Sequence, residues 1–159
     1  MYHEKQRLMF CLEHCINNLF QSQVVTSWKL DEYAEQLTPT RFFLYNPHRT
    51  PFLGNYDVNV LELALGDLGK SLSWCDCRDP TLPNLDLNDD GLFGLIINKP
   101  STNWIARNVL GGRHWFSLKK INSTWYDLDS GLPEGQAIES IRGYLHTVVF
   151  DGGHLFIVK

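Results

Sequence analysis

The stretch CLEHCINNLFQ, from Cys11 to Gln21, decides how this chain begins to fold. Its apolar residues recur with the spacing of one helix face: Leu12, Cys15, Ile16, Leu19 and Phe20. We therefore predict an amphipathic helix whose apolar face packs on a core. Cys11 lies at the start of this helix and off the apolar face, whereas Cys15 lies within it and is expected to be a core residue.

The position of Cys11 makes it a candidate nucleophile. A cysteine in the first turn of a helix feels the positive end of the helix dipole and unpaired backbone N–H groups, which favour a thiolate. Gln6 lies five residues upstream, where its side-chain amide would be available to stabilise an oxyanion. The alternative for any one such cysteine is a small buried hydrophobic residue.

The rest of the chain predicts an α+β order, with helices mostly first and strands mostly later. Thr26 or Ser27 is expected to cap a helix that runs to about Gln36, and Asn55 or Asp57 a further helix that ends at Gly69. Strands are expected over 71–75, 92–98, 114–121, 124–129 and 154–158, with a short helix over 134–145.

A predicted hairpin supplies a base for Cys11. If Ile121 pairs with Thr124 across the turn, the register places Phe116 opposite Asp129. His114 is then the diagonal neighbour of Asp129, with Cα atoms roughly 7 to 8 Å apart. A carboxylate that holds one imidazole nitrogen leaves the other free to accept a proton from a thiol. A three-residue loop or a bulge would instead send Asp129 to the opposite face.

His14 is an alternative base, because it lies one helical turn from Cys11. Glu13 is its neighbour in sequence and does not face it on a helix, so we expect His14 to have no carboxylate partner. Cys75 and Cys77 share a strand face at alternate positions, but no histidine–carboxylate pair is predictable beside them. We expect both to be structural.

Length, composition and charge exclude several classes of protein and partner. The 159 residues, 43% hydrophobic and 20% charged, fit a single domain over 1–159. A net charge of -4 disfavours nucleic acid as a partner.

Because we find no signal segment and no apolar run near the ~20 residues of a membrane span, we expect an intracellular protein of the cytoplasm or nucleus with reduced thiols. The cysteine spacings do not match zinc-ligand pairs, so we expect no metal.

Four spaced motifs together resemble the Josephin domain, a papain-like family of deubiquitinating cysteine proteases. They are YHEKQ at 2–6, CxxHCxNNLxQ at 11–21, RHWF at 113–116 and LDS at 128–130. The resemblance implies a papain-like α+β fold, in which an N-terminal helical lobe carries the nucleophile at a helix start. That lobe would pack on an antiparallel sheet carrying the histidine and the aspartate.

The resemblance also implies roles for individual residues. Cys11 matches the family's nucleophile, His114 its general base, Asp129 the residue that orients the histidine and Gln6 the oxyanion-hole glutamine. Some family members have Asn at the position of Asp129. The implied activity is hydrolysis of isopeptide bonds after the C-terminal Gly-Gly of ubiquitin, by a monomer that needs no cofactor.

Two other functions remain open at this point. One is a ubiquitin-binding module with weak or no catalysis, and the other is a thiol hydrolase for a different ubiquitin-like modifier. The segment over 23–46 is shorter than the helical arm of larger family members, so chain-length preference does not follow from the resemblance. Residues Phe42 to Leu44 fit either a ubiquitin contact or simple burial.

Overall fold

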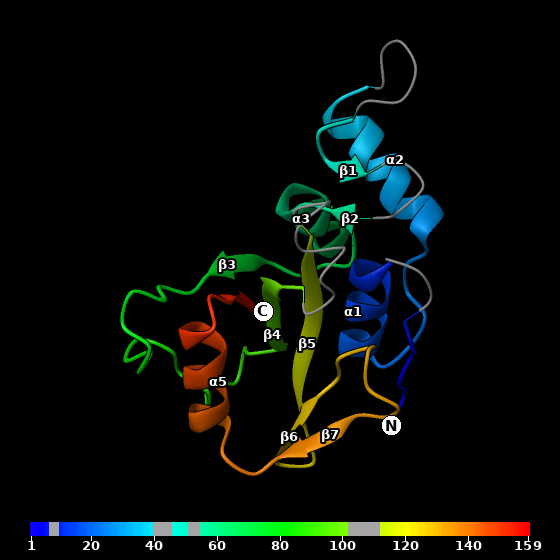
Figure 1. Cartoon of the computed structure of the whole chain (residues 1–159). Coiled ribbons are helices and arrows are strands. Elements are labelled where there is room, and N and C mark those ends of the chain that lie inside the picture. The colour runs from blue at the N-terminus through cyan, green and yellow to red at the C-terminus, as the bar shows by residue number, and fades with distance from the viewer. Residues whose placement is uncertain (7–9, 40–45, 51–54, 102–111) are drawn as a thin grey trace.

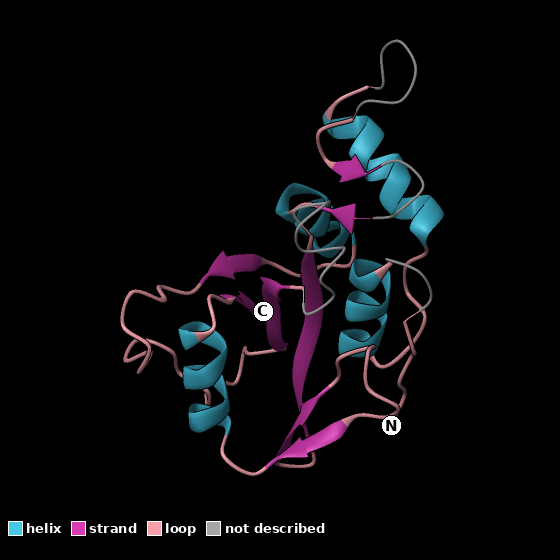
Figure 2. Ribbon diagram, in the orientation of Figure 1, coloured by secondary structure: helices cyan, strands magenta, loops and turns pink. Residues whose placement is uncertain are grey.

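The structure is a computed structural model that describes residues 1–6, 10–39, 46–50, 55–101 and 112–159. Its helices and antiparallel sheets form an α+β fold, which confirms the predicted class. Figure 1 and Figure 2 show the larger sheet inside the main body, with α1 (Cys11–Phe20) and α5 (Ile141–Phe150) on opposite sides of it. The prediction for Phe42 to Leu44 lies outside the described residues.

The larger sheet contains six strands, all from residue 72 onward. Its spatial order is β3 (Leu72–Trp74), β8 (His154–Val158), β4 (Gly94–Pro100), β5 (Arg113–Ile121), β6 (Thr124–Asp127) and β7 (Gln136–Ile138). Every neighbouring pair is antiparallel. At the β5–β6 turn, Asn122 and Ser123 have φ values of 48° and 70°, which matches the tight turn that twisted hairpins favour.

Two further helices pack together beyond one end of the sheet (Figure 1). In α2 (Ser27–Leu37) the cap is Thr26, whose hydroxyl accepts from the Lys29 N–H, and in α3 (Val58–Asp67) the cap is Asp57. These caps decide between the alternatives that the sequence left open. The short strands β1 (Arg49–Thr50) and β2 (Asn55–Tyr56) pair beside them.

The sheet is buried on both faces. One group of core residues joins α1, α2 and α3 to the face that carries Trp115, and the other joins α5 to the face that carries Phe116. Adjacent residues of a strand point to opposite faces, so β5 contributes to both groups. The apolar face predicted for α1 is buried, with Leu12, Ile16 and Leu19 fully enclosed.

The helix predicted over 134–145 is wrong at both ends, since the observed helix α5 runs from Ile141 to Phe150. Residues 136–138 form β7 rather than helix, and α5 begins only at Ile141, after the cap Ser140 accepts from the Gly143 N–H. The strand forms because β6 offers it a free edge, and Trp125 pairs with Ile138. The strands β1 and β2 were not predicted, since two residues are too few for a periodic pattern.

Candidate active site

Cys11 is the first residue of α1 and is 4% exposed. The residue before it, Phe10, provides no side-chain hydrogen bond to the first turn. The N–H groups of that turn therefore keep the partial positive charge of an uncapped helix start. The position at the helix start is as predicted, but Cys11 also packs in the buried core group with Leu12 and Cys15, so the expectation that it lies off the apolar face is wrong.

His114 lies between Cys11 and Asp129. Its Nε2 is 2.6 Å from Oδ1 of Asp129, and the Cys11 side chain lies close enough to contribute, with Asp129, to the raised pKa of the imidazole. Because Nε2 is engaged with the carboxylate, Nδ1 is the ring nitrogen that remains to exchange a proton with a thiol. The structure therefore brings together the three residues that the sequence proposed as nucleophile, base and orienting residue.

The electrostatics of the three groups are coupled. Burial alone would lower the pKa of His114, but its hydrogen bonds to Asp129 and Cys11, with the charges of both groups, raise it to about 9. Burial would raise the pKa of Asp129, but the hydrogen bond and charge of His114 hold that pKa below its ordinary value. An imidazolium at neutral pH is therefore favoured by its two neighbours.

The hairpin register explains why Asp129 reaches His114. Ile121 pairs with Thr124 and Leu118 with Asp127, as predicted. The strand itself ends at Asp127, and the Leu128 N–H continues the register by donating to the Ser117 carbonyl. Asp129 then sits in a loop, where its carboxylate also accepts from the Gly131 N–H at 2.8 Å. This second bond fixes the carboxylate that faces the histidine.

Gln6 belongs to an N-terminal segment that is tied to this same loop. Its backbone N–H donates to the Ser130 carbonyl at 2.8 Å. Upstream, the Tyr2 and Glu4 backbones are bonded by the side chains of Gln21 and Asn18. The segment that carries the predicted oxyanion donor is therefore anchored on both α1 and the loop of Asp129.

The expectation that His14 has no carboxylate partner is wrong. Nδ1 of His14 is 2.6 Å from Oε2 of Glu4, and Asn17 donates to the same carboxylate. Glu4 comes from the N-terminal segment rather than from the helix, so helical spacing could not reveal it. The signal available in the sequence was the polar run His14, Asn17 and Asn18 inside a helix with a long apolar face.

The other cysteines differ from Cys11. Burial raises the pKa of the Cys15 thiol well above its ordinary value, so this residue has the character of the core residue predicted. Burial likewise raises the pKa of Cys75 to about 11. Cys75 and Cys77 follow β3 rather than lie within it, which corrects the predicted strand end.

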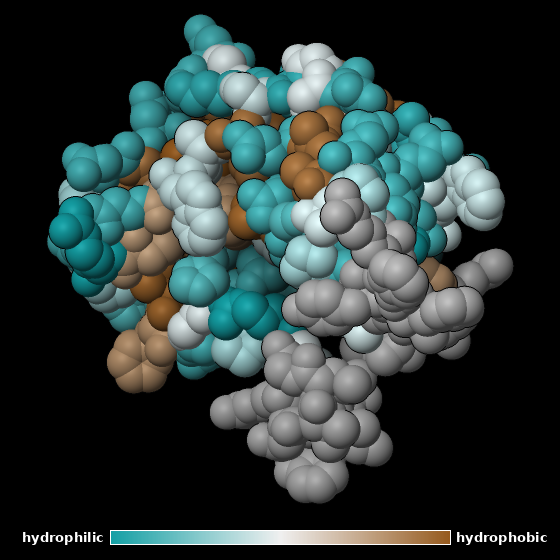
Figure 3. All heavy atoms as spheres, turned by 90° about the horizontal axis from the view of Figure 1, so that it is seen from above, coloured by the Kyte–Doolittle hydropathy of each residue, from teal (hydrophilic) through white to brown (hydrophobic). Residues whose placement is uncertain are grey.

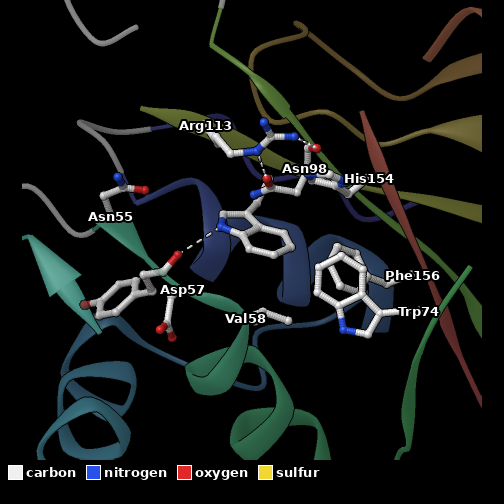
Figure 4. A pocket seen from close by; sticks show the side chains of 10 residues that line it. Asn55, Asp57, Val58, Trp74, Asn98, Arg113, His154 and Phe156 are labelled. Atoms are coloured by element: carbon white, nitrogen blue, oxygen red, sulfur yellow. Dashed lines mark hydrogen bonds between the residues drawn. The ribbon is translucent and has the colours of Figure 1, made fainter. Parts of the chain in front are cut away.

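A pocket of about 310 Å³ lies on the Trp115 face of the sheet, between its end and α3 (Figure 4). Trp74, Phe156 and Val58 contribute apolar walls, and Arg113 is bonded to Asn98 at its edge. Trp115 is 4% exposed and donates its indole N–H to the Tyr56 carbonyl at 3.0 Å. It is thus both a core residue and part of the pocket, directly after His114 in β5.

Among the described residues, no three or more His, Cys, Asp or Glu side chains are grouped so as to hold a metal ion. In the same part of the chain, no helix is both long and apolar enough to cross a membrane. Seen from above in Figure 3, the described surface is mainly hydrophilic, with hydrophobic residues in small separate groups.

The sequence is similar to one family of known proteins. Residues 6–159 match the family model described as Josephin. A Josephin-like protein of Arabidopsis thaliana is 41% identical over 160 residues, which cover 91% of this chain and 43% of that protein. Human Josephin-2 is 37% identical, covering 96% of this chain and 81% of its own length. Human ataxin-3 is 24% identical, covering all of this chain and 45% of its own length. The chain thus spans less than half of the Arabidopsis protein.

Proposed function

The chain belongs to the Josephin family, and from this premise we propose that it is a deubiquitinase of the cysteine-protease type. Its substrates would be ubiquitinated proteins, cleaved at the isopeptide bond after the C-terminal Gly-Gly of ubiquitin. The observation that carries the proposal is the 2.6 Å contact of the His114 imidazole with the Asp129 carboxylate, in an imidazole that also interacts with the Cys11 thiol. This is the arrangement that activates a thiol and delivers a proton to a leaving amine.

The first half of the proposed reaction forms a thioester. The Cys11 thiolate attacks the carbonyl carbon of the terminal glycine, and the carbonyl electrons move to its oxygen. When the intermediate collapses, the C–N bond breaks and the His114 imidazolium gives its proton to the departing lysine amine. Asp129 favours the imidazolium before this step and keeps the ring oriented as it becomes neutral.

The second half restores the enzyme. Neutral His114 takes a proton from water, and the resulting hydroxide attacks the thioester carbonyl, from which the Cys11 thiolate leaves. In both halves the oxyanion would be stabilised by the Gln6 side-chain amide and the Cys11 backbone N–H. Donors of this kind are typically worth about 10²- to 10³-fold in kcat.

A labelling experiment tests the proposal. Ubiquitin that carries a C-terminal thiol-reactive electrophile is incubated with the wild type, Cys11→Ala and His114→Ala. We expect an adduct with the wild type, none with Cys11→Ala and a much slower one with His114→Ala. Cys75→Ser is the matched control, because it removes another thiol and should leave labelling unchanged.

Other results would favour other functions. Labelling that persists in Cys11→Ala contradicts the nucleophile assignment. Binding of unmodified ubiquitin without any adduct indicates a ubiquitin-binding module with little catalysis. Adducts that form only with probes built on other ubiquitin-like modifiers indicate a thiol hydrolase of different specificity.

A further inference from the structure

The N-terminal strap, defined as residues 2–6, is held by two side-chain amides of α1. Asn18 pairs with Glu4: the Glu4 N–H donates to Asn18 Oδ1 at 2.6 Å, and Asn18 Nδ2 donates to the Glu4 carbonyl at 3.2 Å. Gln21 pairs with Tyr2 in the same way, at 3.0 and 3.1 Å. Each amide therefore gives one strap residue the donor and acceptor that a neighbouring strand would supply.

The spacing of the two amides fits an extended chain. Asn18 lies in the last turn of α1, and Gln21 directly follows the helix as its left-handed C-cap residue. Tyr2 and Glu4 are alternate residues, separated by roughly 6.5 to 7 Å in an extended segment. The C-terminal end of α1 and its cap residue thus serve as a template for the strap that leads to Gln6.

Asn18 makes a third hydrogen bond that Gln21 does not share. Its Nδ2 also donates to the Leu128 carbonyl at 3.0 Å, and the residue is fully buried. Leu128 directly precedes Asp129. Since an amide nitrogen has two protons, Asn18 uses both of them, one on the strap and one on the loop that orients His114.

The adjacent Asn17 has a different set of partners. Its Oδ1 accepts from the Val24 and Val25 N–H groups, and its Nδ2 donates to the Val25 carbonyl and the Glu4 carboxylate. Asn17 therefore mainly fixes the loop after α1. The side-chain amide of Asn18 instead bonds to the two segments that flank the candidate site.

We propose that Asn18 is a positioning residue for the reaction, which sets the oxyanion donor Gln6 and the orienting residue Asp129 relative to each other. The inference rests on the function proposed above. A single buried amide joins the strap at Glu4 to the hairpin end at Leu128, and the Gln6 N–H joins the same segments at Ser130. Loss of that amide frees both segments to shift, and a displacement of about 1 Å can cost on the order of a hundredfold in rate.

A double-mutant cycle separates positioning from general stability. Hydrolysis of ubiquitin with a C-terminal fluorogenic amide is measured for the wild type, Asn18→Ala, Gln6→Ala and the double variant. We expect Asn18→Ala to lower kcat on the order of a hundredfold, with KM changed by less than about threefold. The effects of mutating two residues that act as a unit are not additive. The Asn18→Ala change should therefore lower kcat much less in the Gln6→Ala background than in the wild type.

Asn46→Ala is the matched control. Asn46 is also a buried asparagine whose Nδ2 bridges two backbone carbonyls, those of Ala34 and Thr38, but it lies beside α2. The Asn46→Ala variant should have a lower free energy of unfolding, while its kcat should stay near the wild-type value. If the fold-loss in kcat of the double variant equals the product of the losses in Asn18→Ala and Gln6→Ala, the positioning role is overturned. If Asn18→Ala does not fold, Asn18→Ser takes its place, since a serine is too short to bridge Glu4 and Leu128.

A second measurement needs no ubiquitin. The rate at which iodoacetamide alkylates Cys11, located by mass spectrometry, is followed against pH. If Asn18 positions Asp129, its loss weakens the His114–Asp129 bond, and the pH profile shifts in Asn18→Ala but not in Asn46→Ala. A wild type that hydrolyses no ubiquitin substrate contradicts the proposed function, and the alkylation profile alone then decides: a shift supports the inference, and an unchanged profile overturns it.

Discussion

Two histidine–carboxylate pairs lie close to α1 and differ in what they contact. In each pair an imidazole nitrogen is 2.6 Å from a carboxylate oxygen, His14 with Glu4 and His114 with Asp129. Glu4 also accepts from Tyr2 and Asn17, in a network that anchors the chain start. His114 also interacts with the Cys11 thiol, which contributes to its raised pKa. A carboxylate partner is therefore not sufficient to identify a catalytic histidine, because a structural network provides one as well.

The largest expected effect comes from exchanging the two histidines for alanine. His114→Ala should lower kcat/KM for a ubiquitin substrate by between about 10²- and 10⁴-fold, because it removes the group that moves the proton. His14→Ala should change kcat/KM by less than about tenfold once measured below its unfolding temperature. Steady-state kinetics check both, and a greater loss from His14→Ala would reverse the assignment of the base.

The next largest effect concerns Asp129. In Asp129→Ala we expect a loss on the order of a hundredfold in kcat. The hydrogen bond and charge that raise the pKa of His114 to about 9 would be gone, so burial would pull that pKa down. Because activity requires the imidazolium, the alkaline limb of the profile of kcat/KM against pH should move to lower pH. An unchanged limb would contradict the orienting role.

A smaller effect, on stability, is expected at the other pair. Glu4→Gln keeps the size of the side chain but leaves a single acceptor for the Tyr2, His14 and Asn17 donors. The free energy of unfolding should fall by about 1 to 3 kcal/mol, which lowers Tm by about 2 to 4 °C per kcal/mol in a domain of this size. Urea and thermal unfolding measure the change. Glu62→Gln, on the exposed side of α3, should leave stability unchanged.

The smallest effect is expected from Tyr2→Phe, which removes only the hydroxyl that donates to Glu4. Tyr2 is partly exposed, so solvent replaces much of the lost bond, and we expect the free energy of unfolding to fall by about 0.5 kcal/mol. The profile of kcat/KM against pH should match the wild type. A shifted profile would show that the Glu4 network does affect the reacting groups.

Much of the fold followed from local patterns. The first helix, the capped helices α2 and α3, and the last strand form where periodicity and cap residues predicted them. The contact between His114 and Asp129 followed from the hairpin register, because a two-residue turn and a period of two fix which side chains share a face. The strand β7 did not follow, because it depends on pairing with β6 rather than on its own sequence.

By itself, then, the sequence determined the elements that carry the candidate site: a cysteine at a helix start and a hairpin that aligns a histidine with an aspartate. These features depend on neighbours a few residues away. Only the tertiary structure decided that Glu4 lies against His14, and that Asn18 bonds both the strap and Leu128. Those contacts join residues from 10 to 110 positions apart. Such contacts depend on how separate elements pack around a common core, and no periodic pattern in one segment records that packing.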